Sequence, residues 1–190
     1  MSKLRIYLDT SVVNFLFADD APDFRRVTVE FFEKHAGKYE LFASQIVLLE
    51  ISRTPDKGRR DALAAALRGM PVAILPFEPR GEIERMATIY RANAVIPAAK
   101  YEDALHVAHA TVHEMDVLLS WNFKHLANIR RETGIAAINQ REGYSHPLRL
   151  LSPLEVEDED ESECSLCAQG PARGVGMERR DLPGSEASSI

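Results

Sequence analysis

The chain has 190 residues, of which 45% are hydrophobic, which is typical of one folded domain with a proper core rather than a disordered chain. No apolar run approaches the roughly 20 residues of a membrane-spanning helix, so we expect no membrane association. We also expect a cytoplasmic location, because no apolar signal-peptide core is visible and both cysteines, Cys164 and Cys167, lie near the C-terminus.

The acidic charge is concentrated in the last part of the chain. The net charge is −6, but residues 1–154 carry 19 acidic and 20 basic side chains, whereas residues 155–190 carry 10 acidic and 3 basic ones. The overall acidity therefore does not exclude a nucleic-acid partner for the first part. We predict one domain at residues 1–154 and a disordered acidic tail at residues 155–190. The lone Cys-x-x-Cys in that tail has no second metal-binding pair and is read as incidental.

The first predicted element is a strand at residues 4–8, in which apolar side chains alternate with Arg5 and Tyr7. Strands and helices then alternate along the chain, which predicts an α/β fold with a parallel sheet covered on both faces. Residues 148–156 are left open between an edge strand and loosely packed chain. The further predicted strands are residues 39–43, 72–75, 117–120 and 135–138, and the predicted helices are residues 22–35, 45–53, 56–68, 82–93, 101–115 and about 123–131.

Asp9, Thr10 and Ser11 follow the first predicted strand directly. An open α/β sheet binds its ligands beyond the carboxyl ends of its strands, which is where this carboxylate would lie. The alternative is local, because Asp9 or Thr10 could merely cap a following helix whose apolar face includes Val12 and Val13. Asp9 is therefore a candidate functional side chain, with helix capping as the alternative.

Three more polar side chains lie near later junctions between strands and helices. Glu50 lies among aliphatic residues, Asp103 lies in the first turn of a long predicted helix, and Asn122 follows the fourth predicted strand. Each also has a simpler local explanation. Glu50 could lie on a solvated stripe of its helix, Asp103 could interact favourably with the N-terminus of its helix, and Asn122 could cap the next helix. Because carboxyl ends of parallel strands meet at one edge, we predict that these side chains and Asp9 converge there.

Four stretches, taken in order, resemble the PIN-domain family, and most of all its VapC-type toxins of prokaryotic toxin–antitoxin pairs. They are residues 7–11 (YLDTS), 44–50 (SQIVLLE), 103–108 (DALHVA) and 118–126 (LLSWNFKHL). The resemblance covers about residues 3–154 and leaves out the tail. It implies a three-layer α/β/α fold around a parallel sheet, and metal-dependent cleavage of RNA by a cluster of acids.

The resemblance carries the catalytic and metal-binding roles over to Asp9, Glu50 and Asp103. Asn122 stands where many members have an aspartate, so one charge is missing and a second metal ion is in doubt. Mg²⁺ (or Mn²⁺) is the expected cofactor, since it takes oxygen ligands, retains several waters and can assist in-line displacement at phosphorus. Asn122 is counted with these acids in the catalytic site, to which it would add an amide oxygen or a hydrogen bond.

Two hydroxyl side chains complete the expected site. Thr10 or Ser11 could hold Asp9 or a scissile phosphate through a hydroxyl or a backbone N–H. The resemblance also implies an RNA substrate, a cognate antitoxin protein as partner, and a homodimer. The sequence does not name the RNA, the cleavage site or the antitoxin.

Two other functions compete with the nuclease as interpretations of the same residues. A phosphatase of the dehalogenase type needs a second acid two residues after the first, and Ser11 stands there instead. A PIN-fold module that binds RNA or protein without catalysis remains the alternative, because Asn122 replaces an acid.

Several other side chains invite a functional interpretation but have simpler ones. His106, His109 and His113 have helical spacing, and we predict that they lie on a solvated helix face rather than at a zinc site. Trp121 could stack on a base or pack in the core. Basic residues that could line an RNA path, but are more often plain surface, are Arg53, Lys124, Arg130 and Arg131.

Overall fold

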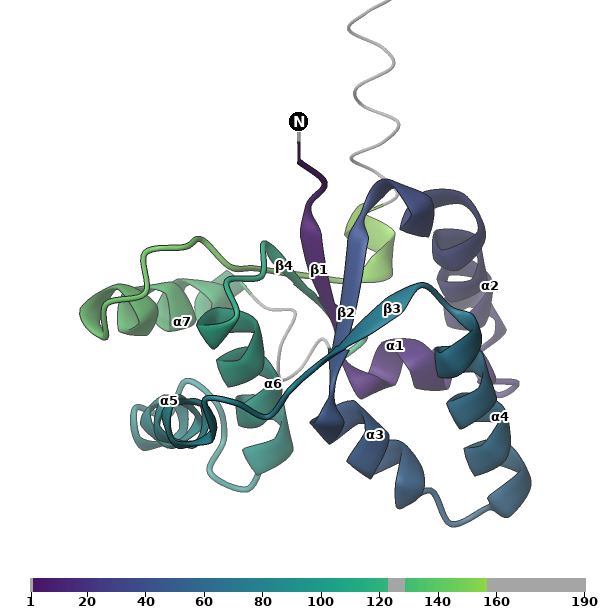
Figure 1. The fold of residues 1–190 in the computed structure, drawn as a ribbon, viewed down its shortest axis with the longest axis horizontal. Coiled ribbons are helices and arrows are strands. Elements are labelled where there is room, and N and C mark those ends of the chain that lie inside the picture. The colour runs from purple at the N-terminus through teal and green to yellow at the C-terminus, as the bar shows by residue number, and fades with distance from the viewer. Residues whose placement is uncertain (1, 123–128, 157–190) are drawn as a thin grey trace, which may run out of the picture.

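The computed structural model describes residues 2–122 and 129–156 (Figure 1). Five parallel strands form one sheet in the order β3-β2-β1-β4-β5. The strands are β1 (Arg5–Leu8), β2 (Glu40–Ser44), β3 (Val72–Leu75), β4 (Val117–Leu119) and β5 (Arg149–Leu151). The helices are α1 (Thr10–Phe15), α2 (Pro22–Glu30), α3 (Gln45–Ser52), α4 (Lys57–Gly69), α5 (Arg80–Ala92), α6 (Tyr101–Val112) and α7 (Ile129–Arg141), with short turns η1 (Phe31–His35) and η2 (Ala36–Lys38).

The helices cover both faces of the sheet, so the predicted three-layer α/β/α architecture is confirmed (Figure 1). One core cluster joins the sheet to α5, α6 and α7, and a second joins the other face to α1, α2 and η1. A third, smaller cluster lies between α1, α3 and α4. In β1, Tyr7 faces the first cluster while Ile6 and Leu8 face the second, as period-two alternation requires.

The sheet reverses its strand order between β1 and β4. From β1 the chain proceeds outward through β2 and β3, and it later returns to add β4 and β5 on the other side. Leu8 pairs with Leu119, and the backbone N–H of Asp9 donates to the carbonyl of Leu119 at 3.1 Å. The residues after β1 and β4 therefore lie side by side at the carboxyl edge, where open α/β sheets bind ligands.

The strand predicted at residues 135–138 is wrong, because these residues belong to α7. Ile135 and Ile138 are both buried, three residues apart on one helix face, and a short apolar run does not distinguish a buried strand from a buried helix. The fifth strand is β5, so of the two options for residues 148–156 the edge strand is correct. The helix predicted from residue 123 lies outside the described residues as far as residue 128.

The histidines of α6 and its C-terminal end do not lie on a solvated face, so that prediction is also wrong. His106 and His109 are 2% and 0% exposed, and His113 is half-buried. The ring of His109 stacks on Phe77 and on His113, with ring centroids 5.1 Å and 5.7 Å away. The physical reason is that α6 packs against both the sheet and α5, which leaves it almost no solvated side.

Replacing His109 with phenylalanine is expected to raise the free energy of unfolding by about 1 kcal/mol. Neither ring nitrogen has a hydrogen-bond partner among the described residues, and such a buried polar group costs about 1–3 kcal/mol. The phenyl ring is larger than the imidazole, and overpacking the core costs part of this gain, whereas the stacking on Phe77 is kept. Chemical denaturation at pH 7.5 would measure the difference, and a less stable variant would contradict the expectation.

The same variant should respond to acid differently from the parent protein. Burial, and then the charges of His113 and His106, lower the pKa of His109 to about 3, below its ordinary value of 6.5. The unfolded chain therefore takes up this proton more readily, so the parent protein keeps its full stability above pH 6.5 as far as this group is concerned. It loses stability progressively as the pH falls toward about 3, by up to about 1.4 kcal/mol per pH unit. The advantage of the phenylalanine variant should widen over that range.

The described chain ends at Val156, which is 3% exposed and belongs to the second core cluster. Residues 153–156 form a helical turn, in which the Glu155 carboxylate accepts hydrogen bonds from the backbone N–H (2.7 Å) and hydroxyl (2.8 Å) of Ser152. The folded part thus continues past residue 154 to Val156 at least. The predicted disordered tail, with Cys164 and Cys167, otherwise lies outside the described residues.

Among the described helices, none is long and apolar enough to cross a bilayer.

Deleting residues 157–190 is expected to change the melting temperature by no more than about 2 °C, because an acidic sequence containing Gly, Ser and Pro buries little. Deleting residues 154–190 should lower it clearly, because the buried side chain of Val156 and the cap made by Glu155 are lost. Thermal melting of both truncated proteins tests this. An equal loss in the two would show that the tail itself stabilises the fold.

Candidate active site

A cavity of about 390 Å³ opens at the carboxyl edge of β1 and β4. All six side chains that the sequence analysis proposed for the site line it, and they come from the ends of two strands and from three helices. The lining residues are Asp9, Thr10, Ser11, Asn14, Phe15, Glu50, Asp103, His106, Trp121 and Asn122. The convergence predicted from the sequence is therefore present, while the individual roles of these residues stay predictions.

Asp9 is both the N-cap of α1 and a wall of the cavity. Its backbone is extended, and its carboxylate accepts from the backbone N–H of Ser11, as the capping alternative requires. The second oxygen accepts from the hydroxyl of Ser120 at 2.5 Å. That hydroxyl also accepts from the backbone N–H of Asn122 at 2.9 Å, so it ties the turn after β4 to Asp9.

Glu50 projects from α3 toward the turn after β1. One oxygen, Oε2, accepts from the hydroxyl of Thr10 and from Nε2 of His106, the latter at 3.0 Å. Partial burial opposes ionisation, but hydrogen bonds from His106 and Thr10 and the charges of His106 and Arg53 lower the pKa of Glu50 below its ordinary value. The glutamate is therefore held as a carboxylate.

His106 is a site residue that the sequence analysis missed. It lies one turn after Asp103 on α6, so both point toward the same edge. Burial opposes its ionisation, but the hydrogen bond to Glu50 and the charges of Asp9, Glu50 and Asp103 raise the pKa of His106 above its ordinary value. The spacing of three residues from Asp103 was the signal that could have identified it.

Asp103 and Asn122 meet across the cavity from α6 and the turn after β4. The amide nitrogen of Asn122 donates to Asp103 Oδ2 at 3.3 Å. Asn122 thus contributes a hydrogen-bond donor in this arrangement, one of the two roles expected for it. Next to Asp103, Glu102 forms an exposed ion pair with Arg53 at 3.0 Å, which links α6 to the end of α3.

The oxygen atoms of the cavity suit a hard divalent cation. Carboxylates and amides are the ligands that Mg²⁺ prefers, and Mg²⁺ commonly binds through one or two carboxylates while keeping several waters. Within the described residues no three His, Cys, Asp or Glu side chains lie close enough to share one ion directly. The donor set therefore fits a hydrated ion, with water between it and some of the acids.

Trp121 packs rather than offering a free face, as one of its two interpretations required. Its indole N–H donates to the Thr28 hydroxyl at 2.8 Å, and its ring lies against Phe15 and Phe24 with centroids 5.6 Å and 4.8 Å away. Trp121 is only 5% exposed. The packing interpretation is confirmed, and the ring anchors the turn after β4 to α2.

Two of the basic residues proposed for an RNA path, Arg53 and Arg131, bind neighbouring groups of the protein. Arg53 pairs with Glu102, and Arg131 donates to the carbonyl of Val95 at 2.5 Å. Lys124 lies outside the described residues. A role of these side chains in RNA binding stays a prediction.

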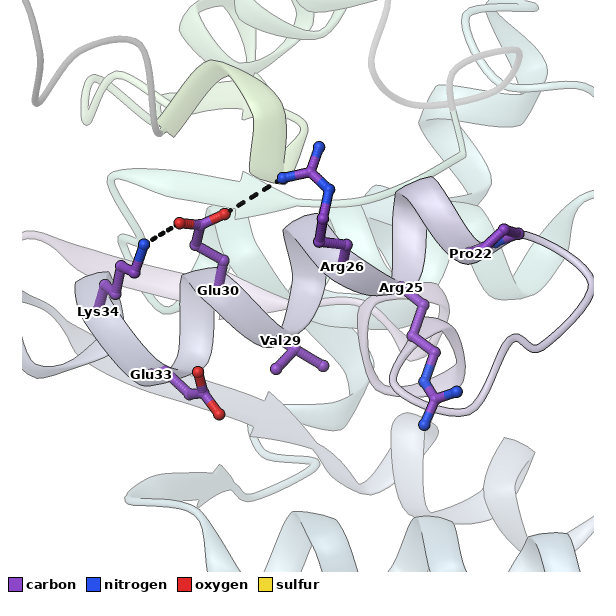
Figure 2. Close-up of a pocket in the computed structure, with 7 residues that line it drawn as sticks. All are labelled: Pro22, Arg25, Arg26, Val29, Glu30, Glu33 and Lys34. Atoms are coloured by element: carbon purple, nitrogen blue, oxygen red, sulfur yellow. Dashed lines mark hydrogen bonds and ion pairs between the residues drawn. The ribbon is translucent and has the colours of Figure 1, made fainter.

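A second hollow, of about 420 Å³, lies along α2 and η1 and shares no lining residue with the cavity that holds Asp9, Glu50 and Asp103 (Figure 2). Glu30 binds both Arg26 and Lys34 along one side of the helix, and Arg25 pairs with Asp19. Most of the charged side chains here therefore form ion pairs with neighbouring residues, so the cavity at the carboxyl edge of the sheet stays the candidate active site. The residues that line the hollow are Pro22, Arg25, Arg26, Val29, Glu30, Glu33 and Lys34.

Comparison with known proteins identifies the class to which this fold and site belong. The PIN domain matches residues 6–130, which is more than half of the chain, so the protein belongs to the PIN-domain family. No curated protein matches it. Among the solved structures that match is the crystal structure of VapBC2 from Rickettsia felis bound to a DNA fragment from their promoter. The match has a TM-score of 0.51 and 17% identity over 78% of this chain and 98% of that chain, which supports the fold alone.

Proposed function

We propose that the protein is a metal-dependent endoribonuclease that hydrolyses RNA phosphodiester bonds and acts as the toxin of a toxin–antitoxin pair in the cytoplasm. The observation that carries the proposal is the convergence of Asp9, Glu50 and Asp103 on one cavity of a PIN fold. They come from the end of β1, from α3 and from α6, which are far apart in the sequence. Carboxylates do not gather in this way for packing, because like charges repel until a cation neutralises them.

The contacts of each site residue suggest its role in the proposed reaction. Asp9, held by Ser11 and Ser120, and Asp103 would hold Mg²⁺ or Mn²⁺, and Glu50 would bind the ion or orient a water on it. The ion, when bound, activates a water and offsets the charge that builds on the phosphoryl group. Thr10 and Ser11 lie beside these acids: the Thr10 hydroxyl holds Glu50 and the Ser11 N–H holds Asp9, and the Ser11 hydroxyl is the group proposed to approach a phosphate oxygen.

Cleavage of a mixed RNA pool by the full-length protein tests the proposal. We expect fragments with Mg²⁺ or Mn²⁺ and none after chelation with EDTA, since oxygen ligands and phosphate need the cation. An inactive protein at millimolar concentrations of both metals would refute the nuclease function.

An antitoxin protein and a homodimer are proposed as partners, and the likeness to a chain in the VapBC2 structure supports the antitoxin. Co-expression with a small protein encoded next to this chain should give a stable complex that no longer cleaves RNA. Light scattering of the protein alone would show whether it forms a dimer.

The second candidate is a PIN-fold module that binds RNA or protein without cutting it. Asn122 favours this alternative, because an amide replaces a charge at the edge of the acid cluster and donates to Asp103. Calorimetric titration with Mg²⁺ separates the two, since a non-catalytic module has no need to bind the ion.

A further inference from the structure

A continuous chain of hydrogen bonds runs from Glu50 into the core. His106 Nε2 lies 3.0 Å from Glu50 Oε2, and His106 Nδ1 lies 2.8 Å from the Tyr7 hydroxyl. The Tyr7 hydroxyl lies 2.7 Å from Ser44 Oγ, which accepts from the backbone N–H of Ile46 at 3.2 Å. Tyr7 and Ser44 are completely buried and His106 nearly so, so water does not compete for these bonds.

The hydrogen atoms can be placed so that every group in this hydrogen-bond chain has a donor or an acceptor as its partner. The Ile46 N–H donates to Ser44, the Ser44 hydroxyl donates to Tyr7, and the Tyr7 hydroxyl donates to Nδ1 of His106. When His106 is neutral, the hydrogen on its Nε2 then donates to Glu50; when His106 is protonated, this hydrogen bond is kept and Nδ1 donates to the Tyr7 hydroxyl instead. Because a fully satisfied buried network is stronger than its separate bonds, it holds its members in one geometry.

This hydrogen-bond chain joins β1, α3 and α6, the elements that carry the acids or, for Asp9, precede it. Ser44 is the N-cap of α3, the helix that carries Glu50. Tyr7 is in β1, two residues before Asp9, and His106 is on α6, one turn after Asp103. A ring of contacts therefore fixes α3, β1 and α6 against one another directly behind the cavity.

We propose that His106 and Tyr7 are positioning residues that set Glu50 against Asp9 and Asp103. A free glutamate side chain on a helix samples several rotamers, but here both described hydrogen bonds, from Thr10 and His106, reach Oε2. No hydrogen bond from the described residues reaches the other oxygen, so it is available to a ligand in the cavity that Glu50 lines. As a positioning device for a metal site, the inference rests on the proposed function.

Four variants of the full-length protein test the inference. His106→Leu removes the donor to Glu50, Tyr7→Phe removes the hydroxyl that orients His106, and His106→Gln restores a donor at the level of Nε2. Tyr90→Phe is the matched control, because Tyr90 is equally buried and its hydroxyl binds Thr111 (2.9 Å) and Asn139 (2.5 Å) away from the cavity.

We expect the dissociation constant for Mn²⁺, measured by calorimetry, to rise about tenfold in His106→Leu and Tyr7→Phe, the scale found when partners of metal ligands are removed. His106→Gln should recover most of this affinity. Tyr90→Phe should lower the melting temperature as Tyr7→Phe does, yet leave Mn²⁺ binding unchanged. Crystal structures of the metal-free variants should show the Glu50 carboxylate displaced in His106→Leu and in place in His106→Gln.

The outcomes separate this inference from the proposed function. If the parent protein binds Mn²⁺ and cleaves RNA but His106→Leu keeps both the affinity and the position of Glu50, the positioning role is refuted and the nuclease function stands. If the parent protein neither binds the ion nor cleaves RNA, the proposed function fails. The position of Glu50 in the metal-free variants then decides the inference by itself.

Discussion

Asp9→Asn is expected to reduce RNA cleavage at least about a hundredfold while leaving the protein folded. The substitution removes a charge from the centre of the acid cluster, and loss of one electrostatic stabiliser of a transition state costs about 10²–10³ in rate. The amide keeps an oxygen for the Ser11 N–H, and asparagine caps helices as well as aspartate does. Initial rates of cleavage in Mg²⁺ would measure the effect, with the melting temperature as the check on folding.

Asp56→Asn is the matched control for this substitution. Asp56 is also an N-cap, accepting from the backbone N–H of Arg59 at 2.6 Å at the start of α4, but it does not line the cavity. The same chemical change there should leave the rate unaltered. Full activity in a folded Asp9→Asn protein would refute the assignment of the metal site.

Asn122→Asp is expected to tighten Mg²⁺ or Mn²⁺ binding about tenfold and to lower the metal concentration needed for cleavage. Asn122 now donates to Asp103 at 3.3 Å, and a carboxylate in its place would repel Asp103 until a cation lies between them. The metal-free variant should therefore be slightly less stable and gain more on binding the ion. Calorimetric titration and melting with and without metal would measure both effects.

Asn93→Asp is the control for metal affinity, since it adds the same charge at the exposed end of α5. Affinity equal to that of the parent protein in both variants would place Asn122 outside the metal site. The catalytic cluster would then consist of Asp9, Glu50 and Asp103 alone.

The first four strands, and the acids expected near their ends, were predicted from local patterns. Alternation in residues 4–8 predicted β1, and a carboxylate directly after it, at Asp9, had no role in packing. The same argument located Glu50 among aliphatic residues of α3. The strand prediction is confirmed because the side-chain period of a strand is a local property, set by the backbone geometry of neighbouring residues, whereas the roles of the acids stay predictions.

What the local patterns could not supply depended on how the elements pack. Ile135 and Ile138 suit a buried strand or a buried helix equally well, and only the space beside α5 and α6 favours α7. His106 looked like a solvated side chain because its partners, Tyr7 and Glu50, are far away in the sequence. The sequence by itself therefore predicted the acids and the elements that carry them. The contacts that hold Glu50 were decided by the tertiary structure, because they form only where β1, α3 and α6 meet and hydrogen bonds between distant residues have no local signature.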